Sequence, residues 1–171
     1  MGMIEATRTC LSKFATFTGR ASRSEYWWFL LAVFIVTIVL SLVDSALFGT
    51  NENAGQPLTG VFQLAMFIPL LSAAWRRLQD SGRPGWYALL PMLFSLAFVV
   101  LSLLGIFLVS VAVEGGEPAG EQTKGVLAII GTTGLIVMGA IQMAVTILML
   151  WWLTRPSDPG ANDYGPSPVR T

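Results

Sequence analysis

The residues of this chain whose types suit binding or catalysis are a group of arginines and the carboxylates near them. Two short polar segments, residues 19–29 and 76–87, together hold five of the ten Lys and Arg residues. An arginine guanidinium presents a rigid fork of donors that suits a carboxylate or a phosphate. Asp80, in the second segment, could orient such a fork, act as a base or bind a metal ion. The candidate chemistry is therefore the recognition of an anionic group.

The candidate cluster combines these arginines with the acidic, aromatic and tail residues that would orient them. A Pro- and Gly-rich segment after the last apolar run is either a disordered tail or a turn that folds back on both polar segments. The cluster comprises Arg20, Arg23, Glu25, Arg76, Arg77, Asp80, Arg83, Trp86, Asn162 and Tyr164. Five aromatic residues are predicted to lie at the membrane interface: Tyr26, Trp27, Trp28, Trp151 and Trp152.

The composition argues against several function classes. Histidine is absent, so the commonest metal ligand and general base is missing. Cys10 is the only cysteine, which excludes an intrachain disulfide, and we expect a buried thiol. No catalytic constellation, metal site or cofactor motif is recognisable. The net charge is zero, so no overall basic character indicates nucleic-acid binding.

The elements that must position the cluster are membrane helices. The chain is 54% hydrophobic and only 12% charged, whereas soluble domains are about 25% charged. Four apolar runs reach the roughly 20 residues that a spanning helix needs, at about 26–48, 58–75, 86–113 and 126–153. They are apolar on all sides, unlike the strands of a barrel. We expect one all-α membrane domain, a bundle of four transmembrane helices, followed by a tail over 154–171.

A shorter helix is predicted before the first span. Ile4, Leu11, Phe14 and Phe17 fall near one face of residues 4–17. This pattern favours an amphipathic helix lying in the membrane interface. A helix that faces the protein core, or a merely local helix, is an equally good interpretation.

The distribution of charge predicts the orientation of the spans. Nine of the ten Lys and Arg residues lie on one side of the membrane. The positive-inside rule makes that side cytoplasmic, and both termini with it. The two loops on the other side hold Asp44, Glu52, Glu114, Glu117, Glu121 and, as their one cation, Lys124.

Local patterns explain part of the two polar segments. Ser22 and Glu25 fit a capping box, in which each side chain bonds the other residue's backbone N–H. Arg76 and Asp80 are spaced to pair along one helix face. Gly82 suits a left-handed position that ends the helix. Asp44 is expected near the outer end of the first span, within reach of water.

Three motifs suggest a family. Residues 19–27, 76–86 and 160–166 resemble, in that order, the three motifs of domain-of-unknown-function family 805. The second motif of that family usually has histidine where this chain has Gln79. The resemblance implies a small multi-pass protein of the bacterial inner membrane and no established activity.

Several functions remain open. The favoured hypothesis is a non-enzymatic binding or scaffolding module whose arginine cluster engages anionic phospholipid headgroups or another membrane protein. Small residues in the fourth span also allow a homo-oligomer. Alternatively, the arginines only set topology and pair with Asp80, Glu25 and the tail. The pattern also leaves open a small transporter or channel subunit, and a membrane enzyme that modifies lipids or transfers phosphoryl groups.

Overall fold

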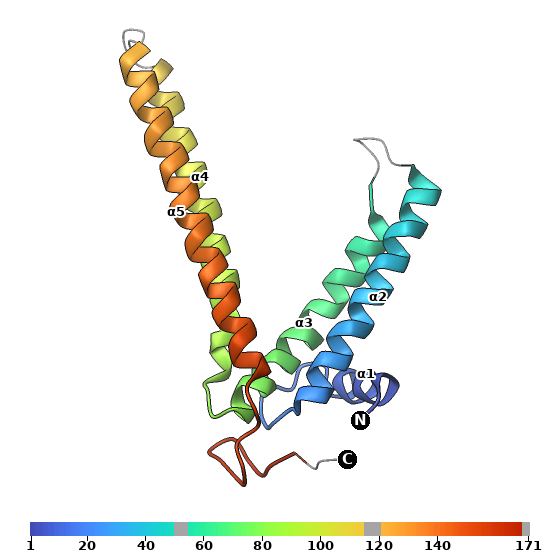
Figure 1. The fold of residues 1–171 in the computed structure, drawn as a ribbon. Helices are drawn as coiled ribbons and strands as arrows, with labels where there is room; N and C mark the ends of the chain where they lie inside the picture. Colours follow the sequence, from blue (N-terminus) through green and yellow to red (C-terminus); the bar gives the residue numbers. More distant parts are fainter. Residues whose placement is uncertain (50–54, 115–120, 169–171) are drawn as a thin grey trace. The chain divides into compact units, whose positions relative to one another are not determined.

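The computed structural model describes residues 1–49, 55–114 and 121–168, without the side chains of residues 108–109, 111–130 and 132. Apart from one isolated bridge in the tail, the regular structure of these residues is helical, which confirms the all-α prediction (Figure 1). The elements are α1 (Met3–Ser12), α2 (Arg23–Phe48), α3 (Pro57–Asp80), the 3-10 helix η1 (Gly85–Leu89), α4 (Leu90–Glu114) and α5 (Glu121–Thr154). The predicted loop positions Glu52 and Glu117, and Arg170 of the tail, lie outside the described residues.

Within the described residues, four segments are long and apolar enough to cross a membrane. They are Arg23–Phe48, Pro57–Asp80, Gly85–Phe107 and Thr133–Thr154. Helix α3 continues five residues past the expected end of the apolar span at residue 75 and ends at Asp80, as the stop signal at Gly82 predicts. The extension is polar and buried by the protein itself, so hydropathy alone does not reveal it.

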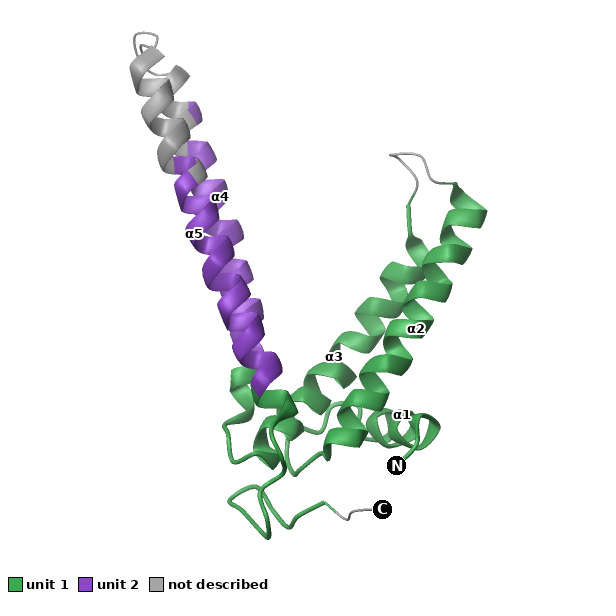
Figure 2. Cartoon of the chain, in the orientation of Figure 1, with its two compact units in different colours: residues 1–88, 152–171 green, residues 89–151 purple. Residues whose placement is uncertain are grey.

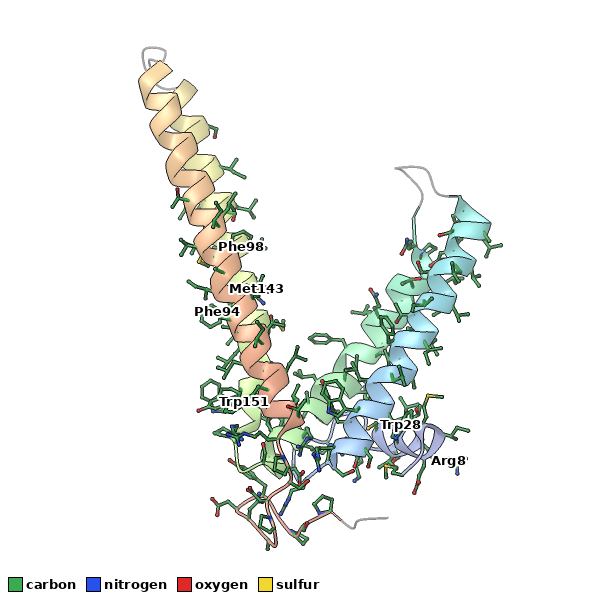
Figure 3. All side chains as sticks on the ribbon, in the orientation of Figure 1. Arg8, Trp28, Phe94, Phe98, Met143 and Trp151 are labelled. Atoms are coloured by element: carbon green, nitrogen blue, oxygen red, sulfur yellow. The ribbon has the colours of Figure 1, made fainter. Side chains whose placement is uncertain are left out.

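The chain divides into two compact units, residues 1–88 with 152–171 and residues 89–151 (Figure 2). The second unit contains α4 and most of α5, which lie side by side as an antiparallel pair. The amide of Gln142 on α5 donates to the Pro91 carbonyl of α4 at 3.4 Å. Phe94, Met143 and Trp151 are exposed on this pair (Figure 3). Such an apolar exterior suits contact with lipid.

The first unit contains α1, the α2–α3 hairpin and the tail. Helix α1 packs on α2 and buries Ala6 and Cys10, which lie one turn apart on the same face. Ile4 and Leu11 stay exposed on other faces. The predicted amphipathic helix is therefore present, with small residues toward the protein and larger apolar residues outward. It ends at Ser12, so Phe14 and Phe17, which were predicted on its apolar face, lie after it.

Asp44 lies at the far end of the hairpin from α1 and is fully buried. Its carboxylate accepts the backbone N–H of Leu58 at 3.2 Å and of Thr59 at 2.8 Å. These N–H groups belong to the first turn of α3, where no intrahelical acceptor exists. Asp44 thus caps the neighbouring helix, which corrects the expectation that its side chain reaches water.

We expect Asp44→Ala to lower the melting temperature of the purified protein by several degrees, because two N–H groups of α3 lose their acceptor. Asp44→Asn keeps one acceptor oxygen and should lose less. Thermal unfolding in detergent measures both effects. Equal melting temperatures for wild type and Asp44→Ala would contradict the capping role.

Candidate functional site

The last turn of α3, Arg76–Asp80, is buried on every side although it is almost entirely polar. The segment before α2 covers one side, and the Ala21 N–H donates to the Arg76 carbonyl at 3.2 Å. The tail covers another, and the Asp158 N–H donates to the Asp80 carbonyl at 2.9 Å. Carbonyls at the end of a helix have no intrahelical donor, and here separate segments supply them.

Five buried charged side chains meet here, three from this turn and two from the segment around the start of α2. They make up what we call the polar core: Arg20, Glu25, Arg76, Arg77 and Asp80. Buried charges are stable only when each is paired and hydrogen-bonded. The pairing within the polar core therefore determines which parts of the chain are held together.

Asp80 is the centre of the polar core. Its Oδ1 accepts Arg20 Nε at 2.9 Å. Its Oδ2 accepts Arg77 Nη1 and the Ser157 hydroxyl. Asp80 and Arg77 are fully buried, and Arg20 is 7% exposed. One carboxylate thus joins the end of α3 to the segment before α2 and to the tail.

Glu25 and Arg76 form a second buried pair. Arg76 Nη1 donates to Glu25 Oε1 at 2.7 Å, and the Cys10 thiol lies 3.7 Å from the same oxygen. The Ser22 hydroxyl accepts the Glu25 N–H, as the capping box predicts. The Glu25 carboxylate, however, binds Arg76 instead of capping in return. Arg76 therefore pairs with Glu25 across 51 residues of sequence and not with Asp80.

Other donors of Arg20 and Arg77 bind backbone carbonyls of the tail and of the last turn of α5. Arg20 donates to the carbonyls of Asp158 at 2.7 Å and Gly160 at 2.5 Å. Arg77 donates to Leu153 O at 3.0 Å and also to Arg155 O. The guanidinium fork can satisfy several acceptors at once, which a lysine ammonium cannot do with the same fixed geometry.

The tail itself folds into a defined turn. The Asn162 and Gly165 backbones pair in both directions, and the Tyr164 N–H donates to Asn162 Oδ1 at 3.0 Å. The Asn162 amide donates to the Gln79 carbonyl at 2.9 Å. The turn thereby lies against α3, as the sequence suggested. Gln79 contributes its backbone here, at the position where the family motif usually has histidine.

The loop after α3 is shaped by two glycines. Gly82 has φ +70°, in the left-handed region predicted for the residue that ends the helix. The indole of Trp75 leaves no space for a Cβ at Gly85.

Arg83, in the same loop, lies over the ring of Trp152, 5.4 Å from its centroid. Trp152 also stacks on Tyr87.

The predicted interfacial aromatics have different environments. Tyr26 is buried, with its ring edge-on to Trp27, whereas Trp28 is exposed. Trp86 is exposed beside Tyr87, and Trp151 is exposed on the other unit. Their positions in the sequence alone do not distinguish these environments, since they do not show which side chains other segments cover.

The structure divides the arginines of the candidate cluster between the interior and the surface. Arg20, Arg76 and Arg77 are buried in the polar core, where they pair with Asp80 and Glu25. Arg23 is exposed, and Arg83 is partly exposed. Lys13 and Ser24 were missing from the candidate cluster. The signal for Lys13 was its place at the end of α1, one of nine cations on the basic side.

Lys13 and Arg23 line a polar pocket of about 660 Å³ in the first unit. Thr9, Ser22 and Ser24 also line it. The Ser22 and Ser24 hydroxyls lie 3.1 Å apart, and the Thr9 hydroxyl donates to the Glu5 carbonyl at 2.9 Å. The N-terminus of α2 opens onto this space and adds the positive end of a helix dipole. Two buried residues of the polar core, Arg20 and Glu25, also line the pocket. Further lining comes from Glu5 and from the tail residues Pro156, Ser157 and Pro168.

Cys10 lies beneath this pocket and is fully buried. Burial raises the pKa of its thiol to about 12, and the nearby Glu25 carboxylate adds to the shift. The thiol therefore stays protonated through the neutral range, where a thiolate would be the reactive form.

We expect folded protein to resist alkylation by iodoacetamide at pH 8 and to react only after unfolding in detergent and denaturant. Mass spectrometry of the intact chain measures the modified fraction. The variant Cys10→Ala/Thr18→Cys, with its thiol at an exposed position, serves as the reactive control. Equal rates for the two folded proteins would contradict the burial of Cys10.

Comparison with known proteins identifies the family. The model of the family "Protein of unknown function (DUF805)" matches residues 14–166. This chain belongs to the DUF805 family. The match spans all the segments that build the polar core, from the loop before α2 to the turn of the tail. No solved structure matches the chain.

Two relatives of this DUF805 chain come from Escherichia coli (strain K12). "Inner membrane protein YhaH" is 32% identical over 114 residues, which cover 67% of this chain and 92% of that protein. "Inner membrane protein YhaI" is 33% identical over 114 residues, which cover 67% of this chain and 91% of that protein. Together with the four spanning segments in the described residues, these relatives place the chain in the bacterial inner membrane.

The described part of this DUF805 protein contains two charged regions, the polar core and the polar pocket, whose charges are paired differently. Among the described residues, no three His, Cys, Asp or Glu side chains come together as metal ligands. The polar core has its carboxylates occupied by arginines. The polar pocket, in contrast, presents cations and hydroxyls, which are the groups that bind phosphate oxygens.

Proposed function

We propose that this protein is a membrane-embedded binding module that engages anionic phospholipid headgroups at the cytoplasmic interface. The observation that carries the proposal is a group of cations, two exposed and one partly exposed, among exposed apolar side chains around α1 and the start of α2. Arg8, Lys13 and Arg23 supply the positive charge, and among the described residues none of them forms an ion pair. Arg8 and Trp28 lie at this end of the first unit (Figure 3).

The apolar side chains near these cations suit the boundary between headgroups and acyl chains. Ile4 is 79% exposed and Leu11 41% exposed on α1. A helix with exposed apolar and basic residues binds in the plane of the interface. Each basic residue near an anionic membrane surface contributes about 1 kcal/mol. The buried arginines of the polar core have a separate role, because they hold the segments that display this surface.

The proposal is tested by delipidating the purified protein and measuring which lipid it retains in mixed micelles. We expect more phosphatidylglycerol than phosphatidylcholine bound per chain by native mass spectrometry. The variant Arg8→Gln/Lys13→Gln/Arg23→Gln should lose this preference. Lys124→Gln removes a cation that the charge pattern assigns to the opposite side and should keep it. Equal retention of both lipids by wild type would refute the proposal.

A further inference from the structure

An apolar groove of about 650 Å³ adjoins the polar pocket. It is lined by Arg23, Ser24, Trp27, Trp28, Leu31 and Thr154. The α2 residues among them recur one and two turns apart, so they form one stripe along the helix. This stripe covers eight residue steps, about 12 Å of helix. The groove therefore begins at the polar end of α2 and continues along its apolar part.

The groove and the polar pocket meet at two residues. Arg23 and Ser24 line both cavities. One side of this junction is rich in charges and hydroxyls, and the other presents indole and leucine surface. A molecule that fills both must carry a phosphate-like anion between a polar group and a hydrocarbon chain. A phospholipid has this order of parts.

The charge of the pocket distinguishes between headgroups. Arg20 and Glu25 are neutralised within the polar core by Asp80 and Arg76. The other charged groups of the lining are Lys13, Arg23 and Glu5 and the amino terminus of Met1, so positive charge exceeds negative charge. A phosphate whose substituent is an uncharged polyol reduces this excess. The ammonium of a zwitterionic headgroup would cancel that reduction.

We infer that the junction at Arg23 and Ser24 is a specific site for one anionic phospholipid with a hydroxylated headgroup. The phosphate binds Arg23 and the Ser24 hydroxyl at the N-terminus of α2. The headgroup hydroxyls extend into the polar pocket toward Thr9 and Glu5. One acyl chain lies along Trp28 and Leu31. The inference rests on the proposed function. It adds a saturable site, a class of headgroup and a position for one acyl chain of the lipid.

The experiment titrates the delipidated full-length protein in detergent with phosphatidylglycerol, phosphatidylethanolamine or free glycerol phosphate. Native mass spectrometry counts the bound molecules. We expect one phosphatidylglycerol per chain at saturation, with at least tenfold weaker binding of the other two. Equal binding of phosphatidylethanolamine would overturn the headgroup class. Equal binding of glycerol phosphate would show a site for a free anion and overturn the place assigned to the acyl chain.

Two single variants separate this site from general attraction to anionic lipid. Arg23→Gln removes the cation at the junction, and Leu31→Trp fills the groove. Both residues are exposed, so both variants should keep the wild-type melting temperature in pure detergent. We expect each to weaken phosphatidylglycerol binding at least tenfold, and Lys124→Gln to leave it unchanged. If both variants bind like wild type while the preference for anionic lipid persists, the site is wrong and the proposed function stands.

Discussion

Asp80→Asn is expected to destabilise the first unit by about 3–5 kcal/mol, the usual cost of removing one partner from a buried ion pair. The loss follows from the contacts of the carboxylate, which accepts from Arg20, Arg77 and Ser157. An asparagine would leave two buried guanidiniums without a counter-ion. The measurement is the free energy of unfolding in mixed micelles, followed by the fluorescence of the tryptophans.

Asp163→Asn is the matched control for this prediction. Asp163 lies on the same tail and is exposed, so the same chemical change there should alter the free energy of unfolding little. A similar small effect from both substitutions would contradict the central place of Asp80.

Arg20→Lys should release the tail although the charge is kept. Arg20 binds the Asp80 carboxylate and two tail carbonyls from one planar group. A lysine cannot reproduce this geometry, and losing two charged hydrogen bonds costs about 3 kcal/mol or more. We expect proteinase K to remove a C-terminal epitope tag from Arg20→Lys faster than from wild type.

Arg23→Lys provides the comparison for Arg20→Lys. Arg23 lies three residues farther along and is exposed, so this variant should retain the tag as wild type does. Tag loss at the same rate in both lysine variants would show that Arg20 does not hold the tail.

Hydropathy was sufficient to predict the helices. The apolar runs are long and continuous, so their number and approximate limits follow from the thickness of the bilayer. The turn after α3 was also predictable, because Gly82 is a local signal for a left-handed residue. The burial of the last turn of α3 was not, since distant segments of the protein, and not lipid, cover Arg76 and Asp80.

The partners of the arginines could not be read from spacing. The spacing rule paired Arg76 with Asp80, but Arg76 binds Glu25 and Asp80 binds Arg20 and Arg77. These choices depend on how distant segments pack against α3. The same limit applies to the candidate site, because a basic cluster in a sequence does not reveal which cations remain exposed. Here the backbone carbonyls of Asp158 and Leu153 accept hydrogen bonds from Arg20 and Arg77.

Hydrogen–deuterium exchange tests most directly whether the polar core holds the tail. The exchange is followed over residues 156–166 in the wild-type protein embedded in lipid nanodiscs. We infer that the polar core fixes the tail and that Lys13 and Arg23 are left to bind an anionic ligand. The Asp158, Asn162 and Gly165 N–H groups are hydrogen-bonded, so we predict slow exchange that Asp80→Asn abolishes. Exchange of the wild-type tail at the rate of the free peptide would contradict the account.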